Sequence, residues 1–382
     1  MEYVKLEEIC TIVSGGTPSR SKPNYWNNGN IPWIKIKDMK SKYIDSAEEF
    51  ITEEGLNNSS TKMLKRDTLL YSIFATLGEV GILKIDACTN QAIAGLSLKE
   101  DSNILKEYLY YYLKSKKKDV NNLGRGVAQN NINLSLLRKF KIPVIPLCQQ
   151  KKIIEVLDNV SSTINNYERE LALLDELVKA RFVEMFGDVQ DAKKHRSIQL
   201  KDICNTVTGG TPSTKHVEYY NGTIPWISTV SLGPNYIDGT TAKAFITQEA
   251  VDNSSTKIIP SGSILFGTRV GVGKSSINQV EMCTNQDIVA IIDLDESKYN
   301  KLYIKYVLDT YQSYFDSIKK GATILGISSD DLKNIYVPDA SLYEQDRFEK
   351  FVKQIDKSRS RIQKSLEASQ ELFDSLMQEY FG

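Results

Sequence analysis

The second half of this 382-residue chain repeats the first half at an offset of 193 to 195 residues. The blocks SGGTPS, IPWI, NSSTK and CTNQ begin at Ser14, Ile31, Asn58 and Cys88, and matching blocks begin in the same order at Thr208, Ile224, Asn253 and Cys283. Self-similarity at a fixed period means that one structural unit occurs more than once. The chain is therefore predicted to contain two copies of a unit of about 190 residues.

Each copy begins with a globular part, residues 1–147 in the first copy and 191–340 in the second. Short β-rich runs such as DTLLYSIF and GSILFGTRV alternate there with turns rich in Gly, Asn and Pro. One amphipathic helix is predicted in each globular part, near Leu105 and near Asn300. This mixture predicts two mixed α/β domains.

Each copy ends with a helical part, residues 148–190 and 341–382, which contains no proline. Apolar residues in both parts follow the alternating four-three spacing of a coiled-coil seam. The predicted seam consists of Ile153, Leu157, Val160, Ile164, Tyr167, Leu171, Leu174 and Val178 in the first helix, and of Phe348, Val352, Ile355, Ile362, Leu366, Phe373, Leu376 and Tyr380 in the second, where Arg359 and Ser369 are polar members.

The two seams predict that the long helices pack against each other. Their length exceeds the roughly 8–20 residues of an ordinary globular helix, which disfavours the alternative that each helix packs only on its own domain. Because the chain order is domain, helix, domain, helix, the second helix can return only antiparallel to the first. The predicted fold is α+β: two tandem mixed α/β domains, each followed by a long helix, with the helices paired as an antiparallel coiled coil under pseudo-two-fold symmetry.

The composition excludes several classes of protein. The 48 Lys and Arg residues balance 48 Asp and Glu residues, unlike the charge of proteins that bind polyanions by bulk attraction. Five cysteines without CxxC spacing and two histidines, His195 and His216, form no zinc pattern and leave little for a His-based active site. The sequence shows neither a signal-peptide pattern nor an apolar run long enough for a membrane span. We expect a reduced, cytoplasmic protein without catalytic residues, metal or cofactor.

Two enzyme motifs are missing from the sequence. The stretch Gly267–Ser276 is close to a phosphate-binding loop, but Thr268 stands five positions before Gly273, where that loop requires glycine. The first copy has Glu79 at the position of Lys274, so we expect a glycine-rich turn between strands instead. The catalytic loop of an adenine methyltransferase would need a Pro-Pro pair, and the chain has none.

The order of the motifs resembles the specificity subunits of Type I restriction-modification systems. SGGTPS and IPWI open each globular half and a long helix follows each half, so the resemblance covers essentially the whole chain. It implies that residues 1–147 and 191–340 are target-recognition domains, each reading one half of a bipartite, asymmetric DNA sequence. It also implies that helices 148–190 and 341–382 are spacers that set the gap between the two halves.

The same resemblance implies where the chemistry takes place. The partners would be double-stranded DNA, two methyltransferase subunits that use S-adenosylmethionine to methylate adenine N6, and a restriction subunit (a helicase-nuclease) that uses ATP and Mg²⁺. This chain would direct modification or restriction by those subunits without catalysis of its own. The alternative is a tandem-domain scaffold that joins partner proteins through the coiled coil and reads no DNA.

Candidate DNA-binding residues lie in polar loops of both globular parts. Residues 1–147 contain 21 basic and 16 acidic residues, whereas residues 191–340 have a net charge of −1. Neutral polar side chains can also read base edges, and Arg or Lys can pair with guanine. The candidates are Ser14, Thr17, Ser19, Arg20, Lys22, Lys35, Lys37, Arg125, Gln129 and Asn130 in the first copy, and Thr208, Thr211, Ser213, Lys215, Ser228, Thr229, Arg269 and Lys274 in the second.

Other repeated residues are predicted to be structural. GGTPS can equally be a turn without contact to DNA, and Trp33 and Trp226 favour core packing over base stacking. The repeated cysteines, Cys10 with Cys204 and Cys88 with Cys283, are expected to be small buried residues. The copies thus agree at turns and helices and differ at the candidate readers, as expected for two readers of different half-sites.

Overall fold

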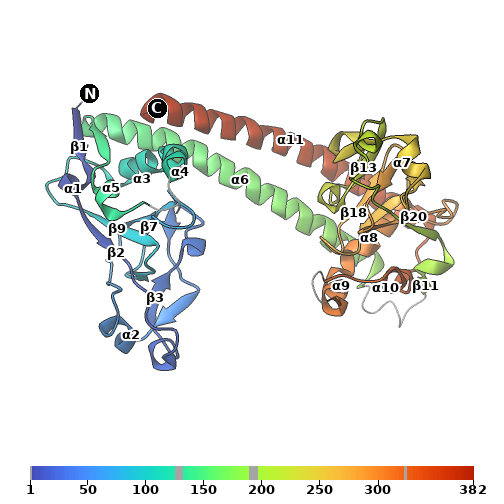
Figure 1. Cartoon of the computed structure of the whole chain (residues 1–382), viewed down its shortest axis with the longest axis horizontal. Helices are drawn as coiled ribbons and strands as arrows, with labels where there is room; N and C mark the ends of the chain where they lie inside the picture. Colours follow the sequence, from blue (N-terminus) through green and yellow to red (C-terminus); the bar gives the residue numbers. More distant parts are fainter. Residues whose placement is uncertain (1, 125–131, 189–196, 322–324) are drawn as a thin grey trace. The chain divides into compact units, whose positions relative to one another are not determined.

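The computed structural model describes residues 2–124, 132–188, 197–321 and 325–382. They form two compact units (Figure 1). Unit 1 comprises Met1–Glu168 and Lys364–Gly382, and unit 2 comprises Arg169–Gln363. Each unit therefore contains one globular copy of the repeat together with a part of each long helix.

Unit 1 is built on a five-stranded sheet with the strand order β2-β9-β6-β7-β4. A three-stranded sheet, β5-β3-β8, packs on it, and β1 pairs with β10. The strands are β1 (Glu2–Lys5), β2 (Cys10–Ser14), β3 (Ile31–Ile34), β4 (Tyr43–Ile44), β5 (Glu49–Ile51), β6 (Leu69–Ser72), β7 (Val80–Leu83), β8 (Cys88–Thr89), β9 (Ile93–Leu98) and β10 (Lys141–Val144). The helices are α1 (Leu6–Ile9), α2 (Glu53–Asn57), α3 (Lys106–Ser115), α4 (Lys117–Gly124) and α5 (Leu134–Arg138).

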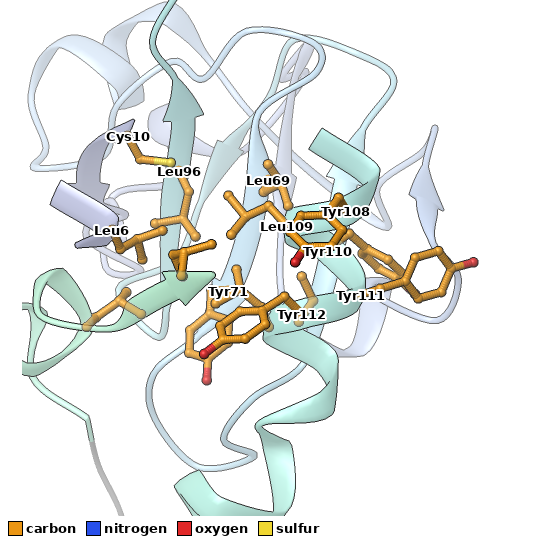
Figure 2. Packing of buried hydrophobic residues seen from close by; sticks show 14 of the residues in the cluster. Leu6, Cys10, Leu69, Tyr71, Leu96, Tyr108, Leu109, Tyr110, Tyr111 and Tyr112 are labelled. Atoms are coloured by element: carbon orange, nitrogen blue, oxygen red, sulfur yellow. The ribbon is translucent and has the colours of Figure 1, made fainter. Parts of the chain in front are cut away.

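The core of unit 1 lies on both faces of the five-stranded sheet. The central strands β6 and β7 of this sheet are buried at every position. Because neither face of these strands meets solvent, their sequences are short, continuous and mostly apolar. Helix α3 covers one face, where Tyr108 and Leu109 pack beside Leu69 and Tyr71 of β6 (Figure 2). The other face packs against Ile34 of the three-stranded sheet.

Unit 2 repeats this arrangement. Its sheets have the orders β12-β20-β17-β18-β14, β15-β13-β19-β16 and β11-β21. The strands are β11 (Ser197–Gln199), β12 (Asn205–Thr208), β13 (Ile224–Ile227), β14 (Tyr236–Ile237), β15 (Ala244–Ile246), β16 (Ile258–Ile259), β17 (Ile264–Gly267), β18 (Ser275–Asn278), β19 (Met282–Thr284), β20 (Ile288–Ile292) and β21 (Tyr336–Pro338). The helices are α7 (Gln248–Asp252), α8 (Lys301–Thr310), α9 (Gln312–Ile318) and α10 (Ser329–Lys333).

The two long helices are α6 (Leu147–Phe186) and α11 (Leu342–Phe381), each unbroken over 40 residues. In unit 1 the first half of α6 packs with the last part of α11, and Leu157 shares a buried cluster with Met377 and Phe381. In unit 2 the last half of α6 packs with the first part of α11, where Phe182 contacts Phe348 at 5.4 Å between ring centroids. Because opposite halves meet in each unit, the pairing is antiparallel, as predicted.

The predicted seam positions lie on the buried side of both long helices. All of these positions are buried or half-buried, including Arg359 and Ser369, whereas most positions between them are exposed. Arg359 stays in the seam because its guanidinium contacts Asp175 of α6 at 2.6 Å and Asp356 of α11 at 3.8 Å.

The compact units divide inside the helices, not at the predicted domain ends, because each half-helix buries its apolar side against the globular part nearest to it. Among the described residues, no helix combines the length and apolar character that a membrane crossing requires.

Candidate nucleic-acid interface

The Gly-Gly turn of unit 1 lies against two other repeated blocks. A Cβ atom added to Gly15 would overlap the carbonyl oxygen of Asn90, and one added to Gly16 would overlap the backbone between Ser60 and Thr61. A side chain cannot fit between these backbones. The glycines of SGGTPS are therefore required by packing against CTNQ and NSSTK.

Hydrogen bonds complete this junction. The indole N–H of Trp33 donates to the carbonyl oxygen of Gly16 at 3.0 Å, and the hydroxyl of Thr17 donates to Oε1 of Gln91. Unit 2 repeats both bonds, the first between Trp226 and Gly210 at 3.0 Å and the second between Thr211 and Gln286. The four repeated blocks thus form one structural junction in each unit.

Replacing Gly15 tests this junction. Gly15→Ala should lower the free energy of unfolding by about 3 kcal/mol, because the added methyl group meets backbone that cannot rotate away. Ser14→Ala, one residue earlier, should cost about 0.5 kcal/mol, since the Ser14 hydroxyl makes a long, local hydrogen bond to the neighbouring Gly15 carbonyl at 3.3 Å. Urea denaturation followed by circular dichroism measures both, and equal losses would contradict the close approach at Gly15.

The polar loops gather at one end of each five-stranded sheet. In unit 1 this loop end is where β2 and β6 finish and where β9 and β7 begin. Lys35 also lies there, because it follows β3, whose last residue Ile34 accepts a hydrogen bond from the Asn90 amide at 3.1 Å. In unit 2 the corresponding loop end carries Thr208, Thr211, Arg269 and Lys274.

An ionic cluster of three residues, Arg20, Glu49 and Lys35, lies beside this junction in unit 1. Arg20 contacts the Glu49 carboxylate at 2.6 Å, and Lys35 contacts its other oxygen. The Arg20 guanidinium also lies 3.6 Å from the ring centroid of Trp26. Both candidate cations are therefore held by one carboxylate on β5.

These contacts shift the pKa values of the side chains involved in the direction that favours their charged forms. Partial burial opposes ionisation of Glu49, but the hydrogen bonds and charges of Lys35 and Arg20 together hold its pKa below the usual range. Hydrogen bonding to Lys37 lowers the pKa of the neighbouring Glu48 and raises that of Lys37. Three basic candidates, Arg20, Lys35 and Lys37, thus share two carboxylates, which offset part of their positive charge.

Unit 2 has a different set of residues at the matching positions. Thr214, Ala244 and Ser228 replace Arg20, Glu49 and Lys35. Ser228 and its neighbour Thr229 are buried, with exposed fractions of 9% and 4%, because they follow the core strand β13. The prediction that these two side chains reach DNA is therefore not supported by their positions.

Arg269 is the exposed guanidinium of the loop end in unit 2. It lies 3.5 Å from Asp287, which follows the exposed Gln286 of the repeated CTNQ block. Phe74 and Ala92 occupy the matching positions of unit 1. The two units therefore place an arginine-carboxylate pair at different points of the same scaffold.

The remaining candidates have simpler surroundings. Lys22 donates to the Tyr25 hydroxyl at 2.9 Å, which raises the Lys22 pKa. Gly271 and Gly273 adopt φ of +71° and +92° beside the exposed Lys274, which confirms the predicted glycine-rich turn between β17 and β18. Ser19, Thr208, Ser213 and Lys215 are exposed, and Ser14 is half-buried. Arg125, Gln129 and Asn130 lie outside the described residues.

Most of the residues predicted to be structural are buried. Trp33 and Trp226 are core residues, with exposed fractions of 2% and 6%. Cys10, Cys88 and Cys283 are buried, and Cys204 is half-buried. Burial raises the pKa of the Cys88 and Cys283 thiols to about 11, so both remain protonated at neutral pH.

Comparison with known families gives the family of the chain. The family described as "Type I restriction modification DNA specificity domain" matches residues 1–175 and, a second time, residues 193–370. The chain belongs to this family. Its two matches cover the two globular copies of the repeat and much of the helix that follows each copy.

Several relatives of this specificity-domain protein are known. A Type I restriction enzyme specificity subunit of Escherichia coli is 33% identical over 195 residues, which is 50% of this chain and 48% of the relative, so the match spans about half of that protein. The MjaIX specificity subunit of Methanocaldococcus jannaschii is 24% identical over 358 residues, which is 87% of this chain and 81% of the relative.

Solved structures support the specificity-domain fold. A structure from a study of complex assembly and conformational transition of the type I restriction-modification system has a TM-score of 0.60 at 16% identity, and the match covers 100% of this chain and 97% of that one. The S subunit from M. genitalium has a TM-score of 0.52 at 14% identity and covers 100% and 96%. At such low identities the likeness concerns the fold, which confirms the prediction of two tandem α+β domains with long helices.

Sequence reasoning missed several residues of these specificity domains. Gln91 and Gln286 are exposed and bonded to candidate threonines, and their exact recurrence in CTNQ was a usable signal. Glu49 and Asp287 left no such signal, because each differs from its counterpart in the other copy. Only the folded structure shows that each of these two carboxylates lies next to an arginine.

Proposed function

We propose that this chain selects the DNA sequence on which a Type I restriction-modification complex acts and performs no catalysis itself. The observation that carries the proposal is the double family match, once on each copy of the repeat. Each unit presents the same junction and the same sheet, but different exposed side chains at the loop end. Such a pair of domains suits a target with two different halves.

The partners and cofactors follow from this assignment. Two methyltransferase subunits would bring S-adenosylmethionine and transfer its methyl group to adenine N6, and a restriction subunit would bring ATP and Mg²⁺. The chain would work in the cytoplasm, where the DNA is accessible. Its own contribution would be binding and orientation: the loop ends contact the half-sites of a bipartite sequence, and the paired helices α6 and α11 set the gap.

Reconstitution tests this function. The purified full chain, incubated with S-adenosylmethionine and a random duplex library, should methylate no adenine. Addition of the cognate methyltransferase subunit should produce methylation at one bipartite sequence, which single-molecule sequencing detects. Methylation by the chain alone would overturn the non-catalytic assignment, and a complex that forms but methylates without sequence preference would favour the scaffold alternative.

A further inference from the structure

At two pairs of matching positions, one copy of the repeat has an arginine together with a carboxylate, and the other copy has neither. Unit 1 has Arg20 with Glu49 where unit 2 has Thr214 with Ala244. Unit 2 has Arg269 with Asp287 where unit 1 has Phe74 with Ala92. The scaffold does not need either pair, because each unit folds in the same way without one of them. The pairs must therefore serve something that differs between the two units.

The unit 1 pair holds its guanidinium in a defined place. Arg20 lies over Trp26 at 3.6 Å from the ring centroid and contacts Glu49 at 2.6 Å. Glu49 is itself fixed, because it pairs with Trp33 across β5 and β3 and its second oxygen binds Lys35. The Arg20 side chain is nevertheless 53% exposed. It is thus oriented and still accessible to a ligand.

The unit 2 pair has the same character with other neighbours. The Arg269 side chain is 54% exposed, whereas Asp287 is 16% exposed. The backbone carbonyl of Asp287 accepts hydrogen bonds from both the amide and the hydroxyl of Thr268, at 2.8 and 3.0 Å. These bonds fix the backbone at Asp287, and the side-chain amide of Asn285 donates to its carboxylate at 3.1 Å.

The chemistry of such a pair favours a base over a phosphate. A planar guanidinium donates two parallel hydrogen bonds to O6 and N7 of guanine, and orienting it beforehand reduces the entropy lost on binding. A neighbouring carboxylate repels phosphate and weakens bulk attraction to DNA. A contact to the phosphate backbone would also be expected at the same position in both units, since every sequence shares that backbone.

We propose that Arg20 and Arg269 each read one guanine, in the half-sites of unit 1 and unit 2 respectively, and that Glu49 and Asp287 are positioning residues that hold the two guanidiniums for this contact. This inference rests on the proposed function. It adds that each half-site contains a G·C pair whose recognition depends on one named arginine.

The test uses the full chain assembled with its methyltransferase subunit and a duplex library randomised in both half-sites. Arg20→Ala should reduce the preference for G at one position of one half-site by roughly 5- to 150-fold. The other half-site should be unchanged, and it serves as a control within the same molecule. Arg269→Ala should do the same in the opposite half-site only.

The carboxylates are tested by substitutions that keep the shape of the side chain. Glu49→Gln and Asp287→Asn should weaken the same guanine preference several-fold. They should also strengthen binding to unrelated DNA, because a negative charge is removed. A purely structural role would change neither the base preference nor its location. Arg20→Lys keeps the charge without the planar fork, so it should weaken the preference, but less than Arg20→Ala does, because a lysine can still donate to guanine.

Arg66→Ala is the matched control in unit 1. Arg66 is exposed and lies 3.9 Å from Asp67, but it precedes β6 at the opposite end of the sheet from the loop end. Its removal should leave both half-sites unchanged. Uniform loss of methylation on all sequences after Arg20→Ala, in a protein with an unaltered circular dichroism spectrum, would mean a backbone contact and would overturn the proposal. An unchanged guanine preference in Arg20→Ala would overturn it as well. Failure of the unaltered complex to select any sequence would instead refute the proposed function.

Discussion

Leu157→Asp is expected to unfold unit 1. Leu157 is the second seam residue of α6, is fully buried, and packs in the same cluster as Leu109, Met377 and Phe381. A carboxylate there would lose its hydration without gaining a partner, which costs several kcal/mol. That loss is comparable with the roughly 5–15 kcal/mol that stabilises a whole domain. Thermal unfolding followed by circular dichroism should show a much lower or absent transition.

Val156→Asp is the matched control for this substitution. Val156 precedes Leu157 on the same helix, but its side chain is 37% exposed and lies off the seam. The new carboxylate would remain hydrated, so the expected cost is below about 1 kcal/mol. Equal destabilisation by the two variants would show that α6 does not bury its seam in the register described.

The helices and the repeat could be predicted because their signals are periodic. The four-three spacing reports which side of a helix is apolar, and it placed all eighteen seam positions on the buried side of α6 and α11. Arg359 and Ser369 fit the same spacing in spite of their polarity. The charge of Arg359 is paired with the carboxylate of Asp175. Periodicity of this kind needs no knowledge of the tertiary structure.

The candidate interface could be predicted only in part. Arg20 was recognisable from its place after a Gly-Gly turn, but Glu49 is 29 residues away and belongs to a run that resembles an ordinary solvated loop. Pairing of β5 with β3 sets Glu49 opposite Trp33, and no local pattern reports that register. Ser228 shows the same limit from the other side, because its place after an apolar strand does not reveal that its side chain is buried. The positions of candidate residues on loops depend on long-range contacts that no local sequence pattern reports.

The start of each long helix depends on a glutamine that sequence reasoning also missed. Gln150, fully buried near the start of α6, donates from Nε2 to the carbonyl oxygens of Asn103 and Ile145, both at 2.8 Å. Its Oε1 accepts the amide of Leu105 at 2.8 Å. One side chain thus joins the helix to two segments of the globular part. Gln345 makes the equivalent three bonds at the start of α11 in unit 2.

Gln150→Ala should therefore lower the free energy of unfolding by about 3 kcal/mol, since it removes a fully buried side chain together with its three hydrogen bonds. Gln149→Ala, at the exposed position immediately before it, should cost about 0.5 kcal/mol or less. Gln345→Ala should reproduce the loss in unit 2, because the bonding is the same there. Urea unfolding of the three variants measures these differences. If Gln150→Ala were as mild as Gln149→Ala, water would be replacing the lost bonds, and the glutamine would not be what fixes the helix to its domain. If it is severe, the direction in which α6 leaves the globular part is set by hydrogen bonds at its first turn as well as by the apolar seam that follows.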